Sequence, residues 1–406
     1  MTDTAGWTPA LAAPTTPVAV AAADAAQQVA GLEVGVTAFA SPTAGWAFVG
    51  APAVCRLLYT DDGGTTWRTQ LAWEGSILGR LAAFSACEAG LALGLTPRAD
   101  SLNGCPVGNG DYTAVFARTH DGGATWTVTS PPDPIKTFTG LFHYRTPRHL
   151  WAVMQPFGYP TTRLVAQTKD GGASWQLARS HADLPPTRIA FSSPADGVAV
   201  AGDGLHSDTL YVTGDGGGTW SRTVLPPPPV PSNAVVTLSP VVRAGTPMLL
   251  LMRVEPDARQ APAGWTGTYA YLREGQEWSG PHRLPRTHAG PELAVVGADG
   301  RFWAASGQDL WVADTLAGPW EHRRVPLPGE HLRTPPWDLR LVPLPSLEVI
   351  ADIAPFDNGV VWLTTTHGAP VGAVPSGQLY RSEDDGVHWT RLAVESRRLG
   401  PKCTRA

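Results

Sequence analysis

The sequence lacks the features that define several protein classes. It has no run of about 18 consecutive apolar residues, the length a membrane-spanning helix needs; its Met248–Met252 stretch has only the length of a buried strand. The mean hydropathy of −0.08 also argues against an integral membrane protein. The net charge of −5 provides no basic field for nucleic acid. We therefore expect a protein that neither crosses a membrane nor binds nucleic acid.

The signatures of common catalytic and metal sites are missing too. There is no H-E-x-x-H, G-x-S-x-G, C-x-x-C or P-loop motif, and the eleven His residues show no metal-ligand spacing. We expect no catalytic residue among such motifs, no cofactor and no metal. His143, on an expected inner strand, is more simply read as a core His with a satisfied hydrogen bond than as a ligand.

One phrase is repeated instead: a hydroxyl residue, an Asp, glycines and a Trp. Its five copies are TDDGGTTW (60–67), THDGGATW (119–126), TKDGGASW (168–175), TGDGGGTW (213–220) and SEDDGVHW (382–389). Two worn copies end at Trp278 and Trp320. The seven Trp residues recur at intervals of 42 to 69 residues, the length of a four-stranded propeller blade with its loops.

Each part of the phrase has a role in a tight turn between strands. The Asp carboxylate is expected to accept hydrogen bonds from backbone N–H groups one and two residues on. The glycines supply positive φ, the Thr or Ser hydroxyl bonds across the turn, and the Trp begins the next strand. We expect these residues to be structural: Asp62, Gly64, Trp67, Asp121, Gly123, Trp126, Asp170, Gly172, Trp175, Asp215, Gly217, Trp220, Asp384, Gly386 and Trp389. The acidic spacing does not fit an EF-hand.

The phrase resembles the Asp-box, or BNR repeat, of sialidase-like, sortilin-type and photosystem II assembly-factor-like propellers. Four copies match fully, and the fifth has His388 in place of a hydroxyl residue. The resemblance implies an all-β, seven-bladed β-propeller of four-stranded antiparallel blades with Asp-box turns between the third and fourth strands. It covers about residues 34–396, which leaves 1–33 as an N-terminal extension or linker and 397–406 as a tail.

Short alternating runs between turn residues predict the strands. In blade 1 they lie near 34–40, 45–50, 55–60 and 66–72, and in blade 4 near 188–193, 198–202 and 209–213. Blade 2 has strands near 81–86 and 91–95, and blade 3 at 141–145 and 150–154. Blade 5 is expected over 234–285 with a second strand at 248–254, blade 6 over 291–326 and blade 7 over 347–395.

The N-terminal segment is Ala- and Thr-rich, and the first basic residue of the chain is Arg56. A secretory signal needs a basic start and a continuous apolar run, so the segment is read as a mature N-terminus without its signal or as a cytoplasmic tail. Residues 17–22 are expected to form an extra edge strand near the closure between blades 7 and 1, or else to be linker with a helical turn near 22–30.

If the boxes are third-to-fourth strand turns, they share one face, the turn face, with the first-to-second strand turns. The second-to-third strand loops and the blade connections then share the other face, the long-loop face. Long loops are more often functional than idle. We expect a ligand- or partner-binding rim there, formed by Arg98, Asp100, Asp111, Tyr112, Tyr159, His206, Asp208, Arg259, Trp265, His331, Arg333, Trp337 and His367.

The family resemblance leaves the activity open. Sialidases hold a substrate carboxylate with three Arg, one of them ahead of the first box, and no Arg precedes Arg56 here. Another glycoside hydrolase needs only two carboxylates at a suitable separation; Asp100, Asp111, Asp208 and Asp257 are candidates. A pocket with a carboxylate pair would indicate an enzyme, and a broad rim of aromatic and Arg residues a partner-binding protein.

We therefore expect a non-catalytic propeller that binds or assembles a partner protein, like the photosystem II assembly factors it resembles. The alternatives are a sialidase-like or other glycoside hydrolase and a carbohydrate-binding surface propeller. The partner or glycan would bind the long-loop face, and the location would be extracytoplasmic in a bacterium. Four Cys allow three complete pairings. We expect Cys55–Cys105, with Cys55–Cys403 as the second choice, and Cys87 as a buried free thiol on the opposite face.

Overall fold

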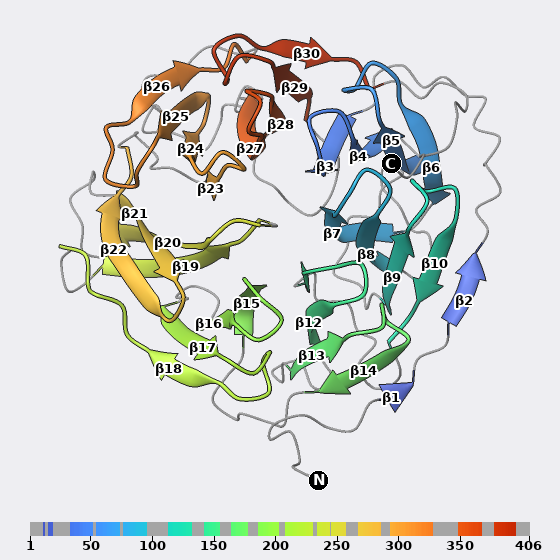
Figure 1. Cartoon of the computed structure of the whole chain (residues 1–406), viewed down its shortest axis with the longest axis horizontal. Helices are drawn as coiled ribbons and strands as arrows, with labels where there is room; N and C mark the ends of the chain where they lie inside the picture. Colours follow the sequence, from blue (N-terminus) through green and yellow to red (C-terminus); the bar gives the residue numbers. More distant parts are fainter. Residues whose placement is uncertain are drawn as a thin grey trace, which may run out of the picture.

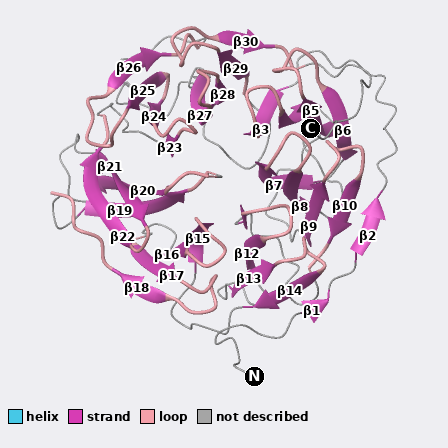
Figure 2. Ribbon diagram, viewed as in Figure 1, coloured by secondary structure: helices cyan, strands magenta, loops and turns pink. Residues whose placement is uncertain are grey.

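The structure is a computed structural model. It describes residues 11–12, 15–18, 33–51, 54–73, 76–95, 113–131, 142–154, 164–177, 186–202, 208–229, 234–243, 245–256, 267–285, 293–327, 348–367 and 377–394. Over these residues the chain forms strands and turns, without a helix (Figure 2). None of these segments is therefore a helix of membrane-spanning length and hydropathy.

Seven antiparallel sheets stand around a central axis as the blades of a propeller (Figure 1). Each blade has four consecutive strands, as the resemblance implies. From the inner to the outer strand, blade 1 consists of β3 (Glu33–Phe39), β4 (Gly45–Ala51), β5 (Val54–Thr60) and β6 (Arg68–Trp73), and blade 2 of β7 (Ser76–Ala83), β8 (Ala89–Leu95), β9 (Thr113–Thr119) and β10 (Trp126–Thr129). Blade 3 consists of β11 (Phe142–Tyr144), β12 (Leu150–Met154), β13 (Leu164–Thr168) and β14 (Ser174–Leu177). Blade 4 consists of β15 (Pro186–Phe191), β16 (Gly197–Ala201), β17 (Thr209–Thr213) and β18 (Ser221–Thr223). Blade 5 consists of β19 (Ala234–Val241), β20 (Met248–Pro256), β21 (Gly267–Glu274) and β22 (Glu277–Arg283). Blade 6 consists of β23 (Leu293–Val296), β24 (Phe302–Ser306), β25 (Asp309–Ala313) and β26 (Glu321–Arg324). Blade 7 consists of β27 (Glu348–Pro355), β28 (Val361–His367), β29 (Leu379–Ser382) and β30 (Thr390–Leu392).

The predicted strands lie close to the observed ones, with one systematic difference on the inner strands. β7 and β15 begin and end earlier than the sequence pattern suggests. The reason is local hydrogen bonding at their ends. Ser192 N–H donates to the Asp196 carbonyl at 3.0 Å, and Phe84 N–H donates to the Glu88 carbonyl at 2.9 Å. These residues therefore belong to the turns that follow the strands.

The core is divided among the blade interfaces. Seven apolar clusters are formed, and each joins side chains of two neighbouring blades. In one of them Trp46 of blade 1 packs with Trp126 of blade 2. Middle strands such as β16, all of whose residues are buried, face two interfaces at once, and for this reason they read as continuous apolar runs.

The repeated turns use their polar groups differently from the prediction. In all five, the hydroxyl of the first residue accepts a hydrogen bond from the N–H of the glycine four residues on, as Thr60 does from Gly64 at 2.9 Å. The Asp accepts from the N–H four residues on, as Asp62 does from Thr66 at 2.9 Å. The expectation of N–H donors one and two residues after the Asp was wrong, because the hydroxyl closes the near part of the turn and leaves the carboxylate to span the far part.

His388 replaces the hydroxyl residue of the fifth copy without loss of a donor. Its backbone N–H donates to Asp384 Oδ1 at 2.8 Å, and its ring Nδ1 lies 2.6 Å from Asp384 Oδ2. In the first copy the Thr66 hydroxyl donates to the corresponding oxygen of Asp62 at 2.5 Å. An imidazole nitrogen therefore takes the place of the hydroxyl.

The ring closes between blade 7 and blade 1 without a shared strand. Val34 and Gly377 exchange two backbone hydrogen bonds of 2.8 and 2.9 Å. Phe39 stacks on Trp362 with ring centroids 4.1 Å apart, and a buried hydrogen bond of 2.7 Å joins the hydroxyls of Thr37 and Thr364. Each of these two blades is thus made of one contiguous segment.

The N-terminal segment forms edge strands, but not where the sequence reasoning placed them. β2 (Thr15–Val18) pairs antiparallel with β10 on the outer edge of blade 2, and β1 (Leu11–Ala12) with β14 of blade 3 (Figure 1). The edge strand is confirmed at 17–18, whereas residues 19–30 lie outside the described part. The predicted place near the closure was wrong, because that closure already has its own backbone bridge, while β10 and β14 have open ladder edges.

Cys87 is disulfide-bonded. The expectation of a free thiol was therefore wrong. That expectation rested on placing Cys87 on the face opposite to the other three Cys. Cys105 and Cys403 lie outside the described residues, so the predicted Cys55–Cys105 pairing stays a prediction.

Candidate functional site

The structure confirms how the turns are distributed between the two faces. The first glycine of a repeated turn donates its N–H to the first-to-second strand turn of the same blade, as Gly63 does to Thr43 at 2.9 Å and Gly171 to Arg148 at 2.8 Å. Both kinds of turn therefore share the turn face. The ends of the second strands and of the outer strands lie on the opposite, long-loop face, where the long connections attach.

Most of the predicted rim lies outside the described residues: Arg98, Asp100, Asp111, Tyr112, Tyr159, His206, Arg259, Trp265, His331, Arg333 and Trp337, with the carboxylate candidate Asp257. Asp208 is described and exposed, and it accepts a hydrogen bond from the Thr209 hydroxyl at 3.1 Å. His367 ends β28, opposite Glu348. These two rim residues belong to blades 4 and 7, so the structure does not bring them together.

A buried acidic residue that the sequence reasoning missed lies at the long-loop end of blade 7. Glu348 is 0% exposed. Its Oε1 accepts hydrogen bonds from the hydroxyls of Thr365 and, at 3.4 Å, Tyr380. Its Oε2 has no hydrogen-bond partner among the described residues. Burial and then the nearby Glu348 raise the pKa of Tyr380 to about 12, so this phenol stays protonated. The signal was an acidic residue at the start of an apolar strand, directly after a Pro-rich connection.

The acidic groups of the repeated turns serve the turns themselves. Burial tends to raise the pKa of Asp62, but the hydroxyl and N–H of Thr66 and the hydroxyl of Thr60 outweigh burial and lower it. The same balance lowers the pKa of the corresponding residues Asp121, Asp170 and Asp215. In the fifth turn, the backbone and then the ring of His388 lower the pKa of Asp384. These carboxylates stay ionised and bonded inside their turns.

The second glycine of a repeated turn also lies against the preceding blade. A Cβ on Gly123, whose φ is +85°, would lie 1.4 Å from the Gln70 side chain of blade 1. One on Gly172 would lie 2.2 Å from the Thr129 hydroxyl of blade 2. A side chain at either position would have to displace a side chain of the preceding blade, so the interface as well as the backbone conformation favours glycine.

A second set of Trp residues was missed by the sequence reasoning. Trp46, Trp151, Trp303 and Trp362 lie near the start of second strands and are fully buried. Trp151 of blade 3 donates its indole N–H to the Gly216 carbonyl in the repeated turn of blade 4, at 2.7 Å. The signal was a Trp that recurs as the second residue of the second strand in four blades.

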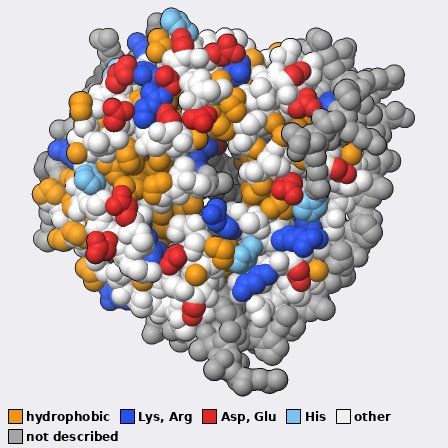
Figure 3. All heavy atoms as spheres, viewed as in Figure 1, with side chains coloured by type: hydrophobic (Ala, Val, Ile, Leu, Met, Phe, Trp, Pro, Cys, Tyr) orange, Lys and Arg blue, Asp and Glu red, His pale blue; other side chains and the backbone are white. Residues whose placement is uncertain are grey.

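Basic side chains gather on part of the turn face. In Figure 3 they lie below and to the right of the ring's centre, over blades 2 to 4. Arg148 and Lys169 are exposed and Arg145 is partly so, and none of the three forms an ion pair among the described residues. These cations share the turn face with the ionised Asp121 and Asp170 of the repeated turns.

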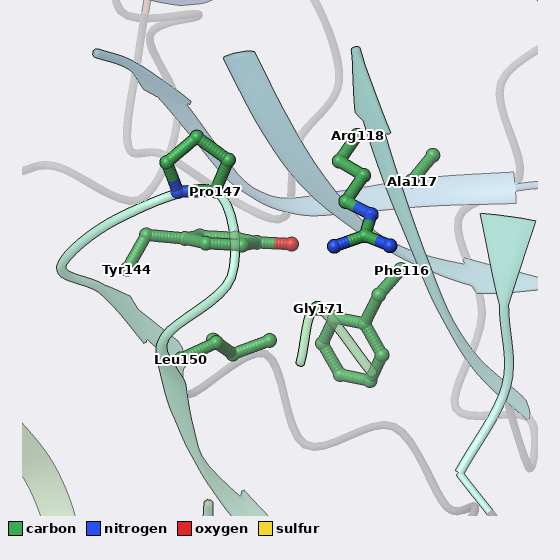
Figure 4. A pocket seen from close by; sticks show the side chains of 7 residues that line it. All are labelled: Phe116, Ala117, Arg118, Tyr144, Pro147, Leu150 and Gly171. Carbon is green, nitrogen blue, oxygen red and sulfur yellow. The ribbon is translucent and has the colours of Figure 1, made fainter. Parts of the chain in front are cut away.

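A small hollow lies between blades 2 and 3, beside these residues. It is lined by Phe116, Ala117, Arg118, Tyr144, Pro147, Leu150 and Gly171 (Figure 4). The Arg118 guanidinium and the Tyr144 hydroxyl point toward each other across it. Within the described segments no group of three or more His, Cys, Asp or Glu side chains is arranged to hold a metal ion.

The chain is thus a seven-bladed β-propeller. No protein-family model and no curated protein matches it, but solved structures do. It is similar to YCF48 bound to a D1 peptide, with 16% identity over 95% of this chain and 87% of that chain and a TM-score of 0.39. A GH74 enzyme of Niastella koreensis is 15% identical over 89% of this chain and 59% of its own, with a TM-score of 0.44.

Prolyl oligopeptidase B of Galerina marginata, bound to a 35-residue substrate, gives a TM-score of 0.53 at 8% identity. The match covers 95% of this chain and 51% of that enzyme, so the chain spans about half of the enzyme's length. At such identities the likeness shows the fold alone. A fold by itself does not decide a function.

Proposed function

We propose that the chain is a non-catalytic Asp-box propeller that binds or helps to assemble a partner protein through its long-loop face. The observation that carries the proposal is the contrast between the two faces. On the turn face each blade ends in tight turns whose polar groups bond to one another. On the opposite face the strand ends are joined by long segments, among them 96–112, 257–266 and 328–347.

This contrast supports binding because a rigid ring that presents variable loops on one side is a common way to build a recognition surface. The sealed blade interfaces fix the strand ends from which those segments start. The segments carry aromatic and Arg residues such as Trp265, Arg333 and Trp337, the residue types that contribute most to protein interfaces.

The contact between Glu348 and Tyr380 favours the runner-up, a glycoside hydrolase, because a carboxylate with a free oxygen beside a phenol resembles catalytic machinery. However, Glu348 is 0% and Tyr380 only 3% exposed. A substrate would have to reach both through the long-loop face, so this observation supports the hydrolase less than the contrast between the faces supports partner binding.

Two experiments separate the proposals. The chain is cross-linked to its partner in the native host, and the captured partner is then purified. The affinity of this partner is measured for wild type, for R333A/W337A and for the turn-face control R145A/R148A. We expect the first variant to weaken binding about tenfold or more and the control to bind like wild type. Equal binding by all three would overturn the choice of face.

In parallel, a panel of fluorogenic glycosides is tested with wild type, E348Q and D208N. We expect no turnover. A turnover that E348Q abolishes while the variant stays folded by circular dichroism would replace partner binding with the hydrolase. Glycan binding without turnover would favour the carbohydrate-binding alternative instead.

We also propose an extracytoplasmic location. It is supported by the disulfide at Cys87, because such bonds persist mainly in oxidising compartments. Peptide mapping of freshly isolated protein under non-reducing conditions tests both the location and the predicted Cys55–Cys105 pairing. Four free thiols would contradict the location, and a Cys87–Cys105 or Cys55–Cys87 bond would contradict the pairing.

A further inference from the structure

Arg118 is a partly buried cation with few partners. It is the residue before the repeated turn of blade 2, on β9, and it extends toward the repeated turn of blade 3. Its Nη1 donates to the Asp170 carbonyl at 3.1 Å, which is its one hydrogen bond among the described residues. Its Nε is buried and has no hydrogen-bond partner in the described part of the chain. Burial of part of a guanidinium without an anion is unfavourable, because the hydration lost by the buried atoms is not replaced.

Blade 7 shows how the same position is neutralised elsewhere in the ring. Arg381 is likewise the residue before a repeated turn, and it lies against the next blade, at Gly63. There Glu383, two residues on, accepts a hydrogen bond from Arg381. The position that matches Glu383 in blade 2 is His120, which lies 3.1 Å from Glu88. Arg118 therefore lacks the carboxylate that Arg381 has.

The nearest acidic group does not fill that role. The Asp170 carboxylate is held within its own turn, where it accepts hydrogen bonds from Thr168 and from the N–H and hydroxyl of Ser174. Burial first, and then the positive charge of Arg148, lower the pKa of Arg118, and Asp170 offsets this only in part. The surroundings of Arg118 thus remain positive.

The hollow beside Arg118 suits an ion with no hydrogen to donate. Its walls are mostly apolar, and Tyr144 is its other polar group. The Tyr144 hydroxyl donates to the Leu91 carbonyl at 2.9 Å, and burial raises the pKa of Tyr144, so this phenol is neutral and supplies no charge. A buried water needs two to four polar partners, whereas this hollow offers mainly the donors of one cation.

We propose that the hollow between blades 2 and 3 binds one halide ion, chloride under physiological conditions, which Arg118 holds as its counter-ion. The halide accepts from the guanidinium, fills the space between Phe116, Tyr144 and Leu150, and links the two blades. It does for Arg118 what Glu383 does for Arg381.

The full chain tests this in two ways. In thermal unfolding, about 100 mM sodium bromide should raise the melting temperature by about 1–2 °C over sodium gluconate of equal ionic strength. This shift corresponds to one site at a bromide concentration roughly ten times its Kd. In crystals soaked in bromide, anomalous diffraction should show a peak in the hollow, within hydrogen-bond reach of the Arg118 guanidinium.

Three variants make the test specific. R118Q should lose the bromide effect, while the matched control R381Q should be less stable than wild type yet keep it. E88Q/H120E gives blade 2 the acid of blade 7, so it should be more stable than wild type in gluconate and respond no further to bromide. The same bromide response in R118Q as in wild type, or an ordered water without anomalous signal in the hollow, would overturn the proposal.

Discussion

Arg243 and Asp352 form an ion pair that passes over a whole blade. Arg243 follows the inner strand of blade 5 and donates to Asp352 on the inner strand of blade 7 at 2.8 Å, and also to the Ile353 carbonyl. Blade 6 lies between them (Figure 1). The side chains are 28% and 42% exposed. The pair therefore ties together blades that are not neighbours, near the axis of the ring.

We expect this pair to contribute modestly to stability. For partly exposed partners, a double-mutant cycle with R243M and D352N should give a coupling of about 0.5–1 kcal/mol, smaller in high salt. R243M should cost more than D352N, because it also removes the bond to Ile353. Urea unfolding measures both effects. A coupling free energy indistinguishable from zero would show that the ion pair does not stabilise the ring.

Acid should weaken the ring through its repeated turns. The folded-state pKa values of Asp62, Asp121 and Asp170 are lowered, so their stabilisation is fully present above the unfolded value of about 3.9. It is lost as the pH falls below that value through the folded pKa. The urea midpoint should therefore drop steeply below about pH 4.

Variants separate this effect from general acid instability. D62N/D121N should be less stable at neutral pH and lose less on acidification. G64A, which damages the same turn without removing a charge, should keep the wild-type slope. Parallel acid profiles for wild type and D62N/D121N would refute the assignment.

The glycine at a blade interface offers a compensation test. G123A should cost more than 1–2 kcal/mol, the usual cost of placing an L-residue at positive φ, because its Cβ also meets Gln70. Adding Q70A should recover the part due to that clash. G214A, where a Cβ would meet nothing within 4 Å, should be nearly neutral. A G123A cost that Q70A leaves unchanged would assign it to the backbone alone.

His388 should be replaceable by the residue found in the other turns. H388T keeps a side-chain donor for Asp384 and should melt close to wild type, whereas H388A removes the donor and should melt lower. Differential scanning calorimetry decides between these outcomes. Equal melting temperatures for H388A and H388T would mean that the ring nitrogen adds nothing to the backbone bond.

Deletion of residues 1–30 should lower the melting temperature by a few degrees, because β1 and β2 cover the outer edges of blades 3 and 2. Hydrogen exchange should accelerate at β10 and β14 and remain unchanged in blades 5 to 7. Faster exchange at the contact between blades 7 and 1 instead would support the sequence-based prediction that the segment lies near the closure of the ring.

The sequence predicts the ring well because each blade is a local unit. The repeated Asp, Gly and Trp residues place the turns, and short apolar runs such as 150–154 place the strands to within a few residues. Contacts between segments that are distant in the sequence are harder to predict. Nothing near Pro17 in the sequence indicates pairing with Trp126 and its neighbours, and nothing near Glu348 indicates the Tyr380 hydroxyl. Most of the predicted rim belongs to connections, where periodicity carries no information about position.

The closure without a shared strand has a consequence for biosynthesis. The hydroxyls of Thr37 and Thr364, 327 residues apart in sequence, meet only in the finished ring. Blade 1 leaves the ribosome first, yet its apolar face with Val34, Ala47 and Val49 has no partner until blade 7 has been made. The nascent chain therefore exposes this apolar face while blades 2 to 6 are synthesised, and a chaperone bound there during that time would protect it from aggregation.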